Sequence, residues 1–252
     1  MELWELIAFS VVGIAGGVLS GLVGVGGGII FVPALVYLAG WNIEEAVAAS
    51  LGIIVFSSIS GVIRSSYSND PVDWKSAGLL SITGAPSALL GVAIHQAVSE
   101  EVVQVSFSIL LLVLALPTAR GRKDVDGGGR TLPLPAVLAF GAVVGTLSGL
   151  LGVGGGVVMV PLLVLGLGLE TKRAVSTSLA VVILTGLVGV SGYLYTGFDE
   201  LSTLPPLIVG AVFGALLGVR IRDWVPSNAL RVGFAVLMLF IALRGLFEVF
   251  YS

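Results

Sequence analysis

The sequence contains no cysteine and only one histidine, His95. Without cysteine the chain has no disulfide, no thiolate nucleophile and no cysteine-ligated metal. A single histidine argues against a histidine-built metal site and leaves an enzyme without the usual set of nucleophile and base. We therefore expect no enzymatic activity, no bound metal and no cofactor.

Charge is also scarce. Only 11% of the 252 residues are charged, whereas soluble domains average about 25%. Apolar runs of about 20 residues, long enough to cross a bilayer, recur from end to end. These runs are continuously apolar and do not alternate as the strands of a membrane barrel do. The sequence therefore predicts an all-α, multi-pass protein of the cell (plasma) membrane, surrounded by lipid and without a nucleic-acid partner.

One segment of the chain occurs twice. The stretch "SGLVGVGGGIIFVP" at residues 20–33 returns as "SGLLGVGGGVVMVP" at residues 148–161, displaced by 128 positions. At the same offset "AVAASL" at residues 46–51 matches "AVSTSL" at residues 174–179. The chain is therefore expected to consist of two repeats, joined by a polar, glycine-rich linker. Their boundaries are expected at residues 1–119 for the first repeat, 120–133 for the linker and 134–252 for the second repeat.

Each repeat is expected to contain five helical elements, the second of them short. A short element of 10 to 13 residues reaches roughly 15–20 Å, about half of the hydrocarbon core. We therefore expect the first two elements to form a hairpin whose tip lies inside the bilayer, followed by three spanning helices. The helices are expected at residues 3–23, 29–38, 46–63, 76–98 and 102–119, and at residues 134–153, 157–169, 174–195, 201–219 and 229–250.

The distribution of Lys and Arg sets the expected orientation, because short cytoplasmic loops are enriched in these residues. With the hairpin arrangement, every Lys and Arg except Arg244 lies on one side, and Arg244 can pair with Glu248 one helical turn on. This side, which includes the linker, is expected to be cytoplasmic, with both termini outside. Because each repeat has an odd number of elements, the two repeats are expected to be inverted relative to each other, as in many secondary transporters.

The two "GVGGG" segments are the expected functional site. Non-helical backbone inside a bilayer leaves polar groups unpaired unless it faces protein or a watery cavity. Each segment precedes a short helix, and glycine nests and helix N-termini favour anions. The expected small-anion site combines these backbone groups with nearby hydroxyls: Ser20, Gly24, Gly26, Gly27, Gly28, Ser50, Ser57, Ser148, Gly152, Gly154, Gly155, Gly156, Ser178 and Thr185.

Alternatives to a functional role exist for several of these features. Glycines spaced four apart before each segment are best explained by close helix packing, and the segments themselves could serve the same purpose. Any single hydroxyl could bond a neighbouring helix or its own backbone. His95 aligns with Arg222 at an offset of 127, so the two could attract anions at opposite mouths, or His95 could simply be interfacial.

The paired "GLVGVGGGIIFVPAL" and "GLLGVGGGVVMVPLL" segments, backed by "AVAAS" and "AVSTS", resemble the sulfite exporter TauE/SafE family over essentially the whole chain. The resemblance implies a membrane transporter, often an exporter, of small sulfur-containing anions such as sulfite or organosulfonates.

Combined with the two segments, this predicts an anion held between opposed tips and moved by alternating access. An anion channel with the tips as its selectivity constriction is the alternative. Coupling to a proton or to sodium and assembly as a homo-oligomer stay open at this point.

Overall fold

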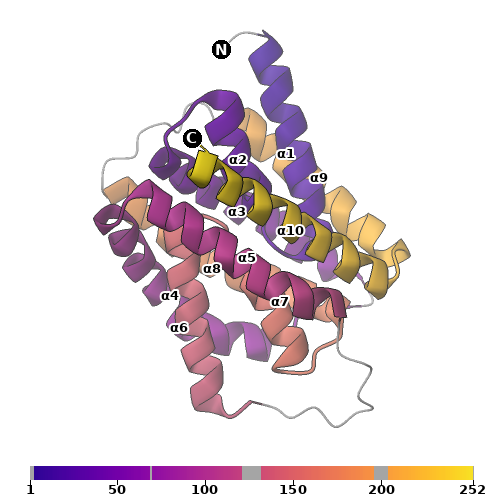
Figure 1. The fold of residues 1–252 in the computed structure, drawn as a ribbon. Coiled ribbons are helices and arrows are strands. Elements are labelled where there is room, and N and C mark those ends of the chain that lie inside the picture. Colours follow the sequence, from indigo (N-terminus) through magenta and orange to yellow (C-terminus); the bar gives the residue numbers. More distant parts are fainter. Residues whose placement is uncertain (1–2, 69, 121–131, 196–203, 252) are drawn as a thin grey trace.

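The computed structural model describes residues 3–68, 70–120, 132–195 and 204–251. All regular structure in these residues is helical, as expected (Figure 1). The helices are α1 (Leu3–Val23), α2 (Gly28–Ala39), α3 (Ile43–Ser65), α4 (Trp74–Ala97), α5 (Glu100–Arg120), α6 (Leu134–Leu151), α7 (Gly156–Leu165), α8 (Thr171–Tyr195), α9 (Leu204–Trp224) and α10 (Ser227–Tyr251). Most of the expected linker, and the expected start of the ninth element at residues 201–203, lie outside the described residues.

The expected helices are confirmed, but several of their ends differ by up to five residues. α9 continues to Trp224, five residues beyond 219, and α8 begins at Thr171, three residues before 174. α3 begins about one turn before residue 46 because Asn42 caps it: the Asn42 side chain accepts a hydrogen bond from the Glu45 amide at 2.8 Å. α7 ends at Leu165, about one turn before residue 169. It ends there because the Leu167 amide donates to the carbonyl of Leu162 at 3.3 Å, a closure typical of a helix C-terminus.

Seven of the described helices are long and apolar enough to cross a membrane: α1, α3, α4, α6, α8, α9 and α10. The short helix α2 and the apolar part of α5 are shorter than this. α3 and α8 are the most buried of the seven, with 78% and 67% of their apolar windows inside the protein. These two helices therefore form the centre of the molecule.

The outer helices pair between the two sequence repeats. α1 packs along α9, and α6 packs along α4. In each pair, glycines spaced four apart let the backbones touch, since a Cβ on any of them would overlap a main-chain carbonyl of the partner helix. The glycines are Gly13, Gly17 and Gly21 of α1 and Gly141, Gly145 and Gly149 of α6. This confirms the expected role of these spaced glycines in close packing.

The central pair is formed by α3 and α8, which run antiparallel. Gly61 near the end of α3 lies against Leu179 in the first half of α8, while Gly189 near the end of α8 lies against Leu51. α5 and α10 form a further pair and lie side by side across the front of the molecule in Figure 1. Every helix of the four main pairs therefore has its partner in the other repeat.

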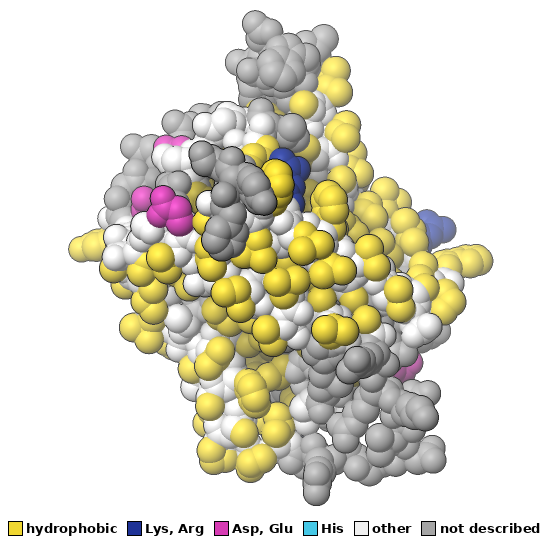
Figure 2. Space-filling view, in the orientation of Figure 1, with side chains coloured by type: hydrophobic (Ala, Val, Ile, Leu, Met, Phe, Trp, Pro, Cys, Tyr) yellow, Lys and Arg dark blue, Asp and Glu magenta, His cyan; other side chains and the backbone are white. Residues whose placement is uncertain are grey.

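The surface of the described residues is unusually apolar. Large side chains such as Ile7, Val113, Phe240 and Phe247 are more than half exposed. Figure 2 shows these hydrophobic side chains covering most of the visible face, with few charged groups among them. Such a surface would be an aggregation hazard in water but is suited to contact with lipid tails.

Candidate functional site

Each hairpin turns through a glycine tip, which we define as residues 24–28 for tip 1 and residues 152–156 for tip 2. Six tip glycines have positive φ, between 67° and 89°. This left-handed backbone is strained for residues with a Cβ. The tips therefore require glycine for their chain path, and not only for close packing. The six are Gly24, Gly26, Gly27, Gly152, Gly154 and Gly155.

The two tips touch each other, although they are far apart in the sequence. A Cβ placed on Gly28 would lie 2.5 Å from the Cα of Val153 and 2.7 Å from the carbonyl oxygen of Gly152. A Cβ on Gly156 would lie 2.6 Å from both the carbonyl oxygen of Gly24 and the Cα of Val25. The tips therefore meet backbone to backbone.

Two apolar side chains pack against both tips. Ile54 of α3 and Val182 of α8 are completely buried and occupy matching positions of the two repeats. Both lie next to Gly26 of tip 1, and both lie next to Gly154 of tip 2. The polar backbone of the tips is thus bordered by an apolar wall from the two central helices.

A serine from the opposite repeat binds the first carbonyl of each tip. Ser178 Oγ on α8 donates to the Gly24 carbonyl at 2.6 Å. Reciprocally, Ser50 Oγ on α3 donates to the Gly152 carbonyl. These two serines were expected among the hydroxyls around the tips, and the structure places them there. Their hydroxyl protons, however, are directed to the protein backbone.

A second pair of hydroxyls binds the third residue of each tip from within the same repeat. Ser57 Oγ lies 3.2 Å from the Gly26 carbonyl, and Thr185 Oγ1 lies 3.4 Å from the Gly154 carbonyl. Both hydroxyls also lie within hydrogen-bond distance of a carbonyl of their own helix, Ser57 Oγ at 3.0 Å from Ile54 and Thr185 Oγ1 at 3.3 Å from Val181, so each shares its single proton between its helix and the tip. A hydroxyl that donates to a tip carbonyl reduces the negative potential that an anion would meet at the tip.

The amides of the tips differ from the carbonyls, because several of them are unpaired. Gly24 N–H donates to the Ser20 carbonyl at 2.8 Å, and Gly152 N–H donates to the Ser148 carbonyl at 3.0 Å. Hydrogen bonding to the main chain resumes with Ile30 and Val158. Between these points, five buried amides in and just after each tip have no hydrogen-bond partner among the described residues: those of residues 25–29 and of residues 153–157.

Unpaired amides of this kind are rare inside proteins, because each costs roughly 1–3 kcal/mol when water is excluded. Here they lie at the N-termini of α2 and α7, where the helix dipole adds a positive potential. An anion is the ligand that best satisfies such a set of donors. The tips are therefore chemically suited to hold one.

Two hydroxyls near the tips also have no partner. Ser20 of α1 and Ser148 of α6 are completely buried, and no described residue bonds either Oγ. Each lies one helical turn before its tip, and Ser148 Cβ would be 3.4 Å from a Cβ on Gly155. Of the six expected hydroxyl-bearing residues, these two keep a free donor.

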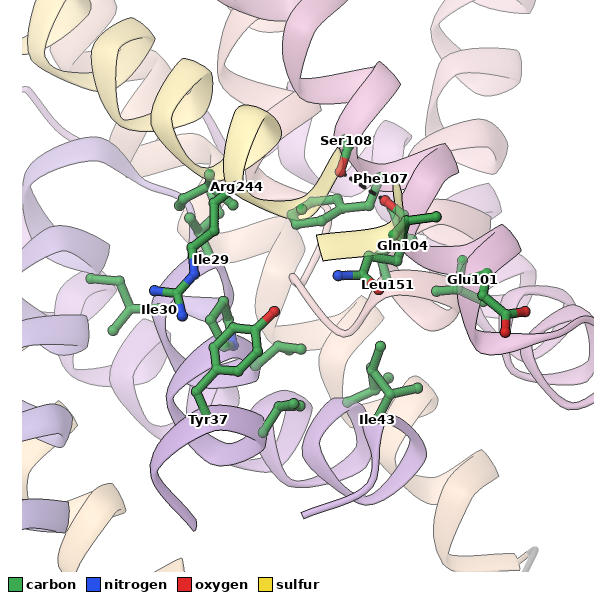
Figure 3. Close-up of a pocket in the computed structure, with 18 of the residues that line it drawn as sticks. Ile29, Ile30, Tyr37, Ile43, Glu101, Gln104, Phe107, Ser108, Leu151 and Arg244 are labelled. Carbon is green, nitrogen blue, oxygen red and sulfur yellow. Dashed lines mark hydrogen bonds between the residues drawn. The ribbon is translucent and has the colours of Figure 1, made fainter. Parts of the chain in front are cut away.

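A pocket of about 570 Å³ lies between α2, α5 and α10 (Figure 3). Ile29, Val47 and Leu151 contribute to its lining. Ile29 and Leu151 adjoin the tips in sequence, and Val47 lies against Gly152. The pocket therefore extends to the residues that flank both tips.

Arg244 lies in the same pocket, and the partner described for it there is not the expected Glu248. The guanidinium carbon of Arg244 on α10 lies 4.4 Å from the ring centre of Tyr37 on α2, a cation–π contact. Figure 3 shows Arg244 and Tyr37 on one side of the pocket and Glu101 on the other. The expected partner, Glu248, has a side chain outside the described residues. Arg244 stood out in the sequence as the one basic residue away from the others, but the pocket itself had no sequence signal.

Comparison with known proteins identifies the family. The model of the family described as "Sulfite exporter TauE/SafE" matches residues 9–245. The chain is 26% identical to probable membrane transporter protein YunE of Bacillus subtilis, over 98% of this chain and all of that protein. It is also 26% identical to probable membrane transporter protein MJ0441 of Methanocaldococcus jannaschii, over 94% of this chain and 92% of that one.

A relative from Haemophilus influenzae, a probable membrane transporter protein, is 27% identical over 92% of this chain and 95% of its own length. These matches run nearly end to end, so they include both tips and the helices around them. With seven candidate spans among its described helices, the chain belongs to the sulfite exporter TauE/SafE family and is a multi-pass membrane transporter.

Proposed function

We propose that this transporter exports a small sulfur-containing anion, such as sulfite or an organosulfonate, by alternating access. The anion is held between tip 1 and tip 2 by their unpaired amides and by the hydroxyls of Ser20 and Ser148. The observation that carries this proposal is the set of five buried amides in and just after each tip that have no partner among the described residues. The sulfur chemistry comes from the family and not from the geometry of the tips.

The charge of the substrate follows from the groups around the tips. The buried polar side chains of the described residues are hydroxyls, one histidine and one arginine, with no carboxylate among them. A cation would therefore find no acidic ligand there. The hydroxyls of Ser50 and Ser178 cover the first carbonyl of each tip, while the tip amides have no partner among the described residues.

Alternating access is supported by the pairing of the helices. α3 and α8 occupy matching positions of the two repeats and cross antiparallel near Ile54 and Val182. Antiparallel matching helices are what two repeats of opposite orientation produce. We therefore place a pseudo-two-fold axis in the membrane plane, between the repeats 1–119 and 134–252. The linker is then cytoplasmic and both termini are outside.

In this arrangement the pocket between α2, α5 and α10 is an outer vestibule. It ends at Ile29 and Leu151, beside tips that touch each other. Moving an anion past this contact requires the tips to separate. A carrier that opens to one side at a time fits such a contact better than a channel, which needs one continuous opening.

The test removes the two free hydroxyls together. In vesicles containing the purified protein, Ser20→Ala with Ser148→Ala is expected to lower sulfite flux by about tenfold, because each hydroxyl bond to a charged ligand is lost. The control is Ser58→Ala, which removes a third buried, unpartnered hydroxyl. Position 186, its match in the other repeat, is glycine, so Ser58 is not part of a symmetric site and its loss should leave flux unchanged.

Three results would overturn parts of this proposal. Unchanged flux in a folded double variant removes the two serines from the site. A wild-type protein that moves neither sulfite, taurine, sulfoacetate, sulfate nor thiosulfate refutes the substrate class. Ion conductance without saturable counterflow of the substrate refutes the carrier and favours the channel.

A further inference from the structure

Arg222 is a completely buried arginine in the last turn of α9. Its Nη2 lies 3.5 Å from Ser65 Oγ at the end of α3, a long hydrogen bond. Its Nε and Nη1 have no partner among the described residues. Arginine stays protonated in proteins, and a buried charge without a counter-ion is strongly destabilising. Such a residue inside a membrane protein is typical of an ion or substrate route.

The charged groups near Arg222 do not neutralise it. Asp223, Asp70 and Arg64 are close enough to act on its charge, and the two carboxylates partly offset the arginine. No ion pair joins either carboxylate to Arg222 in the described part of the chain. Lys172 donates instead to the main-chain carbonyl of Asp223 at 3.2 Å. The guanidinium is therefore left with unused hydrogen-bond donors and without an anionic acceptor among the described residues.

The basic residue at the matching position of the other repeat has a hydrogen-bond partner. Arg222 matches His95 in α4, and Ser65 matches Tyr193 in α8. The His95 and Tyr193 rings meet edge to face, with centroids 5.7 Å apart. His95 Nδ1 lies 2.7 Å from the carbonyl oxygen of Leu150, just before tip 2. A basic residue therefore lies against the same position of a central helix in both repeats. His95 Nδ1 has a partner there, whereas Arg222 Nε and Nη1 have none among the described residues.

A small polar pocket lies at the same end of the molecule as Arg222. It has a volume of about 180 Å³ and is lined by Tyr67, Ser68, Asp70, Lys172 and Asp223. Asp223 is the next residue after Arg222, and Tyr67 follows Ser65 by two positions. The pocket is thus lined by residues close in sequence to Arg222 and Ser65, which do not themselves line it.

We infer that Arg222 and Ser65 form a second anion site, at the cytoplasmic end of the protein, which receives an oxyanion before it reaches the tips. The inference deepens the proposed function and rests on it for the direction in which the anion travels. The free guanidinium nitrogens donate to the oxygens of a sulfite or sulfonate group, and Ser65 completes the contact. At the matching position of the other repeat, His95 Nδ1 already lies at hydrogen-bond distance from a main-chain carbonyl.

The test compares three arginine variants in vesicles of known orientation, with sulfite as the probe. Arg222→Gln is expected to raise the half-saturating sulfite concentration on the cytoplasmic side by about tenfold, because a charge-assisted hydrogen bond is lost. The value on the opposite side should change much less. Arg222→Lys should recover part of the affinity. Arg220→Gln removes an exposed arginine from the same helix end and should behave as wild type.

Thermal unfolding of the purified protein separates a binding role from a structural one. Without anion, Arg222→Gln should be at least as stable as wild type, because an unpaired buried charge is removed. Added sulfite should raise the melting temperature of wild type more than that of the variant. A variant that is clearly less stable without anion, or an equal sulfite effect on both, overturns the inference.

Two further results keep this inference distinct from the proposed function. If the Ser20→Ala, Ser148→Ala protein loses flux while Arg222→Gln transports as wild type, the Arg222 site fails and the tips stand. If wild type moves no sulfur anion but sulfite stabilises it through Arg222, the site stands and the transport proposal fails. An Arg222 effect that appears only in vesicles with phosphatidylglycerol, and not in pure phosphatidylcholine, makes a lipid headgroup the ligand and overturns the inference.

Discussion

Tip 1 and tip 2 have the same chain path and the same hydrogen bonds, although the helices around them differ. Each tip begins with an amide bonded to a serine carbonyl one turn earlier, at 2.8 Å in tip 1 and 3.0 Å in tip 2. Each first carbonyl is bound by a serine of the other repeat. In and just after each tip, five amides have no partner among the described residues. The centre of the molecule is therefore nearly symmetric.

The two ends of the molecule are not symmetric. The base beside tip 2 is His95, bonded to a carbonyl, whereas the matching base is Arg222, with two nitrogens that no described residue binds. Arg244 in the large pocket has no basic counterpart in α5, because the offset of 127 that aligns His95 with Arg222 places Pro117 at the matching position. A carrier uses one site from both sides, so its centre has to serve both conformations. Its ends face different solutions, and there the two repeats are free to diverge.

The largest expected effect tests whether both tips need their glycines equally. A Cβ on Gly27 would lie 2.7 Å from the Gly16 carbonyl oxygen, and one on Gly155 would lie 2.6 Å from Val144 Cγ1. With positive φ added to this overlap, Gly27→Ala and Gly155→Ala should each destabilise the fold by about 2–5 kcal/mol. Size-exclusion profiles and melting temperatures of the purified variants measure this.

The control for the tip glycines is Gly40→Ala. Gly40 has a φ of +70°, but a methyl group added there would meet no atom within 4 Å, so only the backbone strain of about 1–2 kcal/mol remains. A tip variant no less stable than Gly40→Ala would contradict the close contacts described for the tips. A loss at one tip only would break their equivalence.

The next effect concerns the two serines that cross between the repeats. Ser50→Ala and Ser178→Ala each leave a buried tip carbonyl without its donor, which should cost about 1–3 kcal/mol of stability. The carbonyl oxygen left without its donor should also weaken anion binding. Sulfite should therefore raise the melting temperature of both variants less than that of wild type. Because the two bonds are reciprocal, the two variants should lose similar amounts.

Ser191→Ala is the matched control for these serines, since the exposed Ser191 hydroxyl bonds only its own helix. It should change stability by less than about 0.5 kcal/mol. If Ser178→Ala proved as mild as this control, the hydroxyl bond to Gly24 would have no role in holding tip 1.

Most of the fold was predictable from the sequence, because long apolar runs and an internal repeat specify helices directly. The ends of helices were less predictable. The Asn42 cap adds a turn to α3, and the Leu167 amide shortens α7. Both are local hydrogen bonds that hydrophobic periodicity does not record. The relative orientation of the two repeats was inferred from charge and is still a proposal.

The tips and their hydroxyls were also located from the sequence, but not the direction of the bonds between them. A repeat aligns each residue with its own copy, whereas Ser178 bonds Gly24 of the other repeat, 154 positions away. The sequence aligned Arg222 with His95 and placed it on the expected cytoplasmic side, but nothing in it indicated that the Arg222 side chain is buried. Contacts between the two repeats can be found only from the three-dimensional structure.

The smallest expected effect concerns the outer pocket. Arg244 is exposed and lies over Tyr37, so its charge attracts an anion mainly through solvent. Arg244→Gln should therefore raise the half-saturating sulfite concentration on the outer side by only about twofold, and added salt should remove the difference. Flux measured from that side at low and at high ionic strength checks this.

The salt dependence distinguishes the two arginines. The charge of Arg222 is enclosed by protein and little screened, so the effect of Arg222→Gln should persist at high salt, while that of Arg244→Gln should vanish. Arg244→Lys keeps the charge and should transport as wild type at both ionic strengths. If Arg244→Gln lowered affinity strongly and independently of salt, Arg244 would contact the anion directly, and the outer end would hold a site comparable to that of Arg222.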